Sequence, residues 1–188
     1  IFYQILFFNK LLAKEIKFDA SDIEINEGQN LTIANNGTAQ IKDDGIIVEG
    51  IKIKYFKDQS LIVVEQGKIS KIDLNLEITS EIIEYNLKDA KINFTDKVNI
   101  DDKKNDLVIY SNKINYDIGN QKIFGQGNTK IIDEFDNTYE VSEFEYSTKD
   151  KIIKLADTKV SDLNENTFFL KVAYLDLNKK EIVAKDIG

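Results

Sequence analysis

The chain repeats one short pattern six times: an apolar residue, a polar residue, then Tyr or an aliphatic residue. The copies are Ile23-Glu24-Ile25, Ile53-Lys54-Tyr55, Ile83-Glu84-Tyr85, Ile114-Asn115-Tyr116, Phe144-Glu145-Tyr146 and Leu175-Asp176-Leu177. Their first residues are separated by 30, 30, 31, 30 and 31 positions. A fixed period of this length indicates one structural unit that is stacked many times.

Each unit contains a second apolar run after a polar turn. In the first unit this run is 31–34, followed by Gly37 and Ile41; in the fourth it is 123–125, followed by Gly127 and Ile131. Apolar and polar residues largely alternate within the runs, which is the period of a strand with one buried and one exposed face. The pattern therefore predicts an all-β fold of about six 30-residue units, each a pair or triplet of short strands.

Two all-β layouts fit such a unit. Hairpins can stack into a long, open, twisted sheet that is folded over on itself, or each unit can wind one coil of a β-helix. The repeat alone does not choose between them, although about 30 residues is long for one coil and suits a strand pair better.

Composition limits the functions that this chain can have. Its 188 residues are 42% hydrophobic and 31% charged, as in one folded domain. The chain contains 25 basic residues, all of them Lys, and 33 acidic ones, which give a net charge of -8 and a pI of about 4.7. An acidic surface without clusters of Lys and aromatic residues repels phosphate backbones, so nucleic acid is not an expected partner.

The chain contains neither Cys nor His. The usual thiolate and imidazole nucleophiles, general bases and transition-metal ligands are therefore missing. No Gly-rich phosphate loop or nucleophile elbow is present either. We therefore predict a protein that is not an enzyme and that has no catalytic residues, no metal site and no cofactor.

Residues 1–13 form an apolar stretch that is too short to span a bilayer and ends in Ala13, just before the polar pair Lys14 and Glu15. This stretch resembles the end of a secretory signal peptide without its basic start, and we interpret it as the remnant of one. The alternative is an ordinary first strand or helix. The folded domain is expected at 16–188, in an exported protein that needs no disulfide.

At this point the residues resemble a known family. The segment 114–117, a short polar turn and the segment 123–131 (Ile-Phe-Gly-Gln-Gly-Asn-Thr-Lys-Ile) are similar to the repeat of the OstA-like domains of the lipopolysaccharide transport (Lpt) family, roughly I-x-Y-D, turn, I-x-A-x-G-N-V-x-I. The resemblance covers nearly all of 16–187. It implies an open β-jellyroll, or β-taco, whose inner face takes the acyl chains of lipopolysaccharide.

Both the resemblance and the apolar alternation select residues for that inner face. The residues expected to bind lipid are Ile33, Ile53, Tyr55, Val63, Ile83, Tyr85, Ile92, Phe94, Ile114, Tyr116, Ile123, Phe144, Tyr146 and Leu155. Ile23, Ile25, Leu175 and Leu177 are expected to face the same way. Since the sugar phosphates of lipopolysaccharide are anionic, a chain of net charge -8 would leave them in solvent and recognise the tails.

The resemblance also implies partners. An open jellyroll has unpaired strands at both ends, and in this family successive domains join edge to edge by strand addition. The expected edges are 16–26, with Ile16, Phe18, Ile23 and Ile25, and 168–187. The end of the sequence within a strand-like run favours the N-terminal periplasmic domain of the outer-membrane assembly protein LptD, whose partners would be the outer-membrane barrel and its lipoprotein; the absence of Cys speaks against it. The expected location is the periplasm, attached to the outer membrane.

Other interpretations stay open. One is a free periplasmic bridge protein of the same system, similar to LptA. Another is a surface or structural β-solenoid with a closed, dry core and no affinity for lipid. A third is a periplasmic binding domain for a different ligand.

Overall fold

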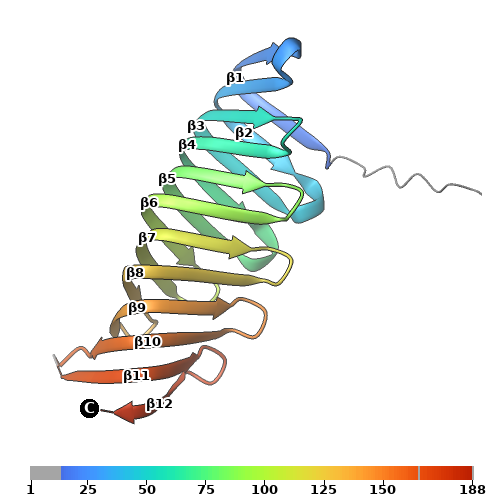
Figure 1. Ribbon diagram of the computed structural model, residues 1–188. Coiled ribbons are helices and arrows are strands. Elements are labelled where there is room, and N and C mark those ends of the chain that lie inside the picture. Colours follow the sequence, from blue (N-terminus) through green and yellow to red (C-terminus); the bar gives the residue numbers. More distant parts are fainter. Residues whose placement is uncertain (1–13, 165, 188) are drawn as a thin grey trace, which may run out of the picture.

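The computed structural model describes residues 14–164 and 166–187, with side chains up to Ala184. Within them the chain forms one antiparallel sheet whose strands follow each other in chain order (Figure 1). The strands are β1 (Ile16–Asn26), β2 (Leu31–Ile41), β3 (Ile46–Phe56), β4 (Leu61–Lys71), β5 (Leu76–Asn86), β6 (Lys91–Asp102), β7 (Leu107–Asp117), β8 (Lys122–Ile132), β9 (Thr138–Ser147), β10 (Ile152–Ser161), β11 (Thr167–Asp176) and β12 (Glu181–Ile187). The predicted all-β class, built from strand pairs, is confirmed. The predicted signal-peptide remnant at 1–13 lies outside the described residues.

Short turns join the strands. Three of them are single 3₁₀ turns, η1 (Glu27–Gln29), η2 (Lys42–Asp44) and η3 (Ile72–Leu74). The residue after each of these turns has a left-handed backbone: Asn30, Gly45 and Asn75 have φ values of 48°, 61° and 53°. Asn and Gly adopt this conformation at low cost, which explains why they stand there.

All strand pairs join neighbours in the chain and are antiparallel. Successive coils of a β-helix instead stack on each other as parallel strands, so the structure takes the folded-sheet layout and not the coil. At its ends the sheet stays open, because β1 pairs only with β2 and β12 only with β11.

A line of backbone irregularities crosses the middle of the sheet. Asn36, Gln66, Gly127 and Asp157 lie halfway along β2, β4, β8 and β10 and have positive φ angles, as do the adjacent Asp96 and Lys97 in β6. The strand register skips or shifts at the same positions, for instance between Thr79 and Ile82 of β5. Such irregularities bend a strand, and aligned across the sheet they fold it into two layers, seen in front and behind in Figure 1.

The fold explains why one face of a single sheet is dry. A flat sheet leaves both faces in water, yet Ile53, Ile83 and Ile114 have no exposed surface. They belong to one buried cluster with residues from the other half of the strands, such as Val48, which is equally buried. The core therefore lies between the two layers, and the sheet covers itself.

Two residues that were expected inside are on the outer face. Ile33 is paired with Glu24 and Lys54, and Val63 with Lys54 and Glu84, so both lie in a row of charged, outward residues. Their neighbours Ala34, Ile62 and Val64 are the buried residues of these strands. At Val63 the prediction was wrong because β4 begins with an apolar run, 61–64, in which alternation does not fix the register. At Ile33 the alternation of Leu31, Thr32 and Ile33 favoured the wrong face, because the small Ala34 is the residue that is buried.

Candidate functional site

An apolar row runs through the inner face from one end of the sheet to the other. Strand pairing places its members side by side, and most have no exposed surface. The row consists of Ile23, Ala34, Ile53, Val64, Ile83, Phe94, Ile114, Gly125, Phe144, Leu155, Ala173 and Ala184. None of these residues has a polar side chain, so this row has the chemistry of hydrocarbon along its whole length.

A second inner row, nearer the strand ends, alternates aromatic and aliphatic residues. Tyr85 pairs with Ile62 and Ile92, and Tyr116 pairs with Ile92 and Ile123. Tyr146 follows, paired with Ile123 and Ile153. We call Tyr85, Tyr116 and Tyr146 the tyrosine row; its members are two strands, or about 10 Å, apart.

The other residues expected to bind lipid share this face. Ile53, Ile83, Ile92, Phe94, Ile114, Ile123, Phe144 and Leu155 are buried, and Tyr55 is partly buried beside the ring of Phe18. Apart from Ile33 and Val63, the predicted residues are therefore brought together. Their binding of lipid stays a prediction, because the side chains fill the space between the layers. A hollow of about 900 Å³ lies elsewhere, near the bend, and Lys97, Tyr110 and Lys159 help to line it.

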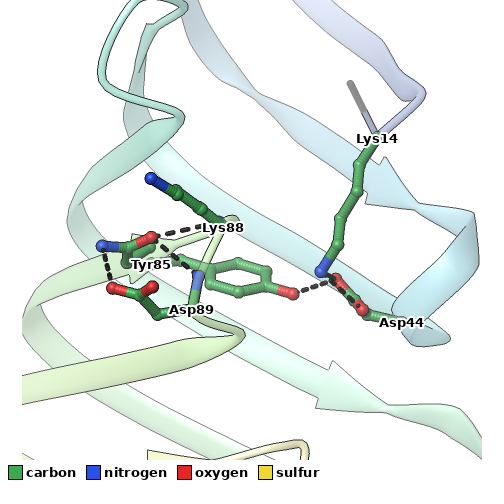
Figure 2. Close-up of polar contacts among 6 residues, drawn as sticks. Lys14, Asp44, Tyr85, Lys88 and Asp89 are labelled. Carbon is green, nitrogen blue, oxygen red and sulfur yellow. Dashed lines mark hydrogen bonds and ion pairs between the residues drawn. The ribbon is translucent and has the colours of Figure 1, made fainter. Parts of the chain in front are cut away.

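The two sets of turns meet along the edge opposite the bend, and we call this line the seam. Here the Tyr85 hydroxyl, at the end of β5, donates to the carboxylate of Asp44 in η2 (Figure 2). The ammonium of Lys14 holds the same carboxylate, with N–O distances of 2.7 and 2.8 Å. Residues 41 positions apart in the chain thus close one stretch of the seam.

A second contact of the same kind closes the seam further along. The Tyr146 hydroxyl donates to Asp102, and the side-chain amide of Asn105 donates to both Asp102 (2.7 Å) and the Tyr146 oxygen (3.1 Å). Asp102 is only 3% exposed. Beyond it, the ammonium of Lys180 pairs with Glu134. Burial and a neighbouring carboxylate raise the pKa of Tyr85 and of Tyr146 far above the usual value.

Tyr116 lies between Tyr85 and Tyr146 in the tyrosine row but does not make a contact of this kind. It is 1% exposed, and among the described residues its hydroxyl has no hydrogen-bond partner. Asp73, which follows the pattern of Asp44 and Asp102, instead pairs with Lys71 at 2.6 Å. Burial, with a smaller contribution from the charge of Asp73, raises the pKa of Tyr116 to about 12.

Sequence reasoning missed the carboxylates of the seam. Asp44, Asp73, Asp102 and Asp133 recur at steps of 29, 29 and 31, in the turns between units, so the repeat carried the signal. Without the bend, however, nothing indicated that these turns approach the tyrosines. The predicted edge residues lie as expected on β1: Ile16 and Phe18 are partly buried, while Ile23 and Ile25 are 43% and 71% exposed.

The described residues hold no group of three or more Asp or Glu side chains that could bind a metal ion. In the same part of the chain, no helix is long and apolar enough to cross a membrane.

Comparison with solved structures finds several chains that are similar to this one. A solved structure of LptH from Pseudomonas aeruginosa, the LptA-homologous periplasmic component of the lipopolysaccharide transport device, aligns with 92% of this chain and 96% of its own. The sequence identity is 12% and the TM-score 0.31. No protein-family model and no curated protein matches the sequence.

Proposed function

We propose that this chain is a carrier for the acyl chains of lipopolysaccharide in the periplasm, without enzymatic activity. The observation that carries the proposal is the inner apolar row, which runs without a polar interruption from Ile23 in β1 to Ala184 in β12. The OstA-like repeat of the sequence supports the same function.

Lipid would lie between the two layers and enter at the seam. Each methylene removed from water contributes about 0.8 kcal/mol, so one acyl chain of about a dozen carbons offers roughly 10 kcal/mol. To enter, the lipid would have to break a few noncovalent contacts at the seam, made by Tyr85, Tyr146 and Lys180, and to separate the packed layers. The sugar and phosphate groups would stay outside, in solvent, away from an acidic chain.

The open edges are the proposed joints to other jellyroll domains. β1 has one edge without a strand partner and exposes Ile23 and Ile25, and β11 exposes Phe168 and Phe169 at the far end. Strand addition at these edges would continue the inner row from one domain into the next. In the system, the chain would act either as the periplasmic domain of LptD, attached to the outer membrane, or as a free bridge similar to LptA; fractionation of cells into membrane and periplasm separates the two.

Site-specific photocrosslinking tests the carrier function. p-Azidophenylalanine, which adds only a small azide to the native ring, replaces Phe94 or Phe144 on the inner face, and Asn93 or Glu145 on the outer face of the same strands as matched controls. With lipopolysaccharide present, we expect adducts at the inner positions alone. A folded protein without adducts at any position would exclude the carrier function and favour a structural role.

A further inference from the structure

We propose that Tyr116 is the polar contact of the carrier site: its hydroxyl donates a hydrogen bond to the oxygen at the head of a bound acyl chain, at the seam. The inference rests on the proposed function and names the place and the chemistry by which lipid is held. The group recognised is a carbonyl or carboxylate oxygen directly attached to an alkyl chain.

The first argument is the missing partner. A buried hydroxyl without a hydrogen bond destabilises a folded protein, and native structures seldom contain one without a reason. Tyr85 and Tyr146 occupy equivalent positions and both donate to a carboxylate across the seam. Tyr116 alone in the tyrosine row has no partner in the described part of the chain. Its hydroxyl is therefore available to a ligand.

The second argument is that the expected partner of Tyr116, the carboxylate of Asp73, is bound to another residue. By the repeat, Asp73 corresponds to Asp44 and Asp102, but its carboxylate pairs with the Lys71 ammonium, which is largely buried at the end of β4. Thr148 is also near Tyr116, and its oxygen could accept while its own proton is donated to the carbonyl oxygen of Gln121 at 3.1 Å, but the two hydroxyls lie outside hydrogen-bond geometry. The surroundings of Tyr116 thus leave its donor unused.

The third argument is position. Tyr116 is the last inward residue of β7 before the turn, so its hydroxyl lies at the seam and its ring borders the apolar interior. Ile114 continues the same face two residues deeper, next to Phe94. A donor at the boundary above a continuous hydrocarbon surface matches an acyl chain, whose single oxygen-bearing group is at one end.

Binding measurements on the full chain test this assignment with Tyr116→Phe and the matched variant Tyr146→Phe. The probes are lipopolysaccharide, whose acyl chains carry ester and amide carbonyls, myristic acid, which carries a carboxylate, and dodecyl maltoside, whose alkyl chain carries neither. For Tyr116→Phe we expect an affinity about tenfold lower for one or both of the first two probes and unchanged for dodecyl maltoside. Loss limited to lipopolysaccharide or to myristic acid identifies the source of the oxygen.

Thermal unfolding without lipid provides the second readout. Tyr116→Phe removes an unpaired hydroxyl, so its midpoint should equal or exceed that of the wild type, whereas Tyr146→Phe loses a hydrogen bond and its midpoint should fall. Equal lipid affinity of Tyr116→Phe and wild type would overturn the inference, and so would a midpoint lowered as in Tyr146→Phe. If the wild type bound no lipid at all, the carrier function itself would fail, which is a distinguishable result.

Discussion

At the scale of single residues, the tyrosines of the seam combine an apolar ring with a hydroxyl that must be satisfied. Burial raises the pKa of Tyr85, Tyr116 and Tyr146, and of Tyr139, which donates to Asp133 in the turn before β9, because the phenolate is less stable in the interior than in water. In Tyr85, Tyr139 and Tyr146, the neighbouring carboxylate that accepts the hydrogen bond raises the pKa further. The same contacts that close the seam therefore link folding to alkaline pH.

The first prediction is a loss of stability above about pH 10. The folded pKa values exceed the unfolded value of about 10, so the contribution of these tyrosines is complete below pH 10 and is lost as the pH rises toward the folded pKa, about 12 for Tyr116. Each tyrosine should reduce the free energy of unfolding by roughly 1 kcal/mol per pH unit above 10. Urea unfolding between pH 8 and 11 measures this slope.

Tyr116→Phe is the control for that slope, because Lys residues also titrate in this range. The variant has one fewer ionisable group in the unfolded chain, so its stability should fall less steeply above pH 10 than that of the wild type. Parallel slopes for the two proteins would contradict the assignment of alkaline lability to the buried tyrosines.

A second prediction concerns Gly125, where the inner row has no side chain. A Cβ atom placed there would lie 2.2 Å from Cε1 of Phe144, which occupies the space instead. Gly125→Ala should therefore displace the Phe144 ring and reduce the free energy of unfolding by about 1–3 kcal/mol. At Gly28 the nearest atom to such a Cβ is 3.6 Å away, so Gly28→Ala should change stability by less than about 0.5 kcal/mol. Equal effects would show that the inner row is loosely packed.

At the scale of strands, the repeat was sufficient to predict the units and the inner face of most strands, whereas the two edges were expected from the resemblance to an open jellyroll. Strict alternation in Ile83-Glu84-Tyr85 fixes which side chains face inward, and the structure agrees there. Val63 was misplaced because it lies in an apolar run in which either register satisfies the pattern, and Ile33 because the small Ala34, rather than the larger Ile33, is the buried residue. The seam could not be predicted, since a contact such as that between Asp44 and Tyr85 depends on a bend in the middle of the strands.

The bend gives a third prediction, at Gln66 in the middle of β4. Its φ of 48° is left-handed and its side chain is exposed, so conformation rather than packing determines which residue suits the position. Gln66→Gly should be neutral or raise the free energy of unfolding by up to about 1 kcal/mol, and Gln66→Val should lower it by about 1–2 kcal/mol.

Gln40→Val, on the neighbouring part of the sheet, is the matched control. Gln40 is exposed in β2 and has no positive φ, so Val should be tolerated there as a good strand former. Thermal unfolding of the three variants compares them directly. If Val were equally tolerated at Gln66 and Gln40, the bend would not depend on left-handed residues.

At the scale of the whole molecule, the sheet does not close on itself and has two open edges. β1 and β12 each have one edge without a strand partner, and the apolar inner row is exposed at its last member in β1, Ile23. An edge of this kind binds another strand unless charge or a covering segment prevents it. Such an edge at either end makes association with a second jellyroll domain the expected state at sufficient concentration.

The last prediction therefore concerns Ile25, which is 71% exposed on the inner side of β1. Ile25→Lys places a charge where the inner face would continue into the joined domain, and burying that charge without a partner is unfavourable. We expect this variant to stay monomeric at protein concentrations at which the wild type associates, with an unchanged thermal midpoint because Ile25 packs little within the chain. Glu24→Gln changes the net charge by the same amount on the outer side of the same strand and should associate as the wild type does. Light scattering across a concentration series measures the association of the three proteins. If Ile25→Lys associated as readily as the wild type, β1 would not be the joining edge, and β12 would be the edge that binds the partner.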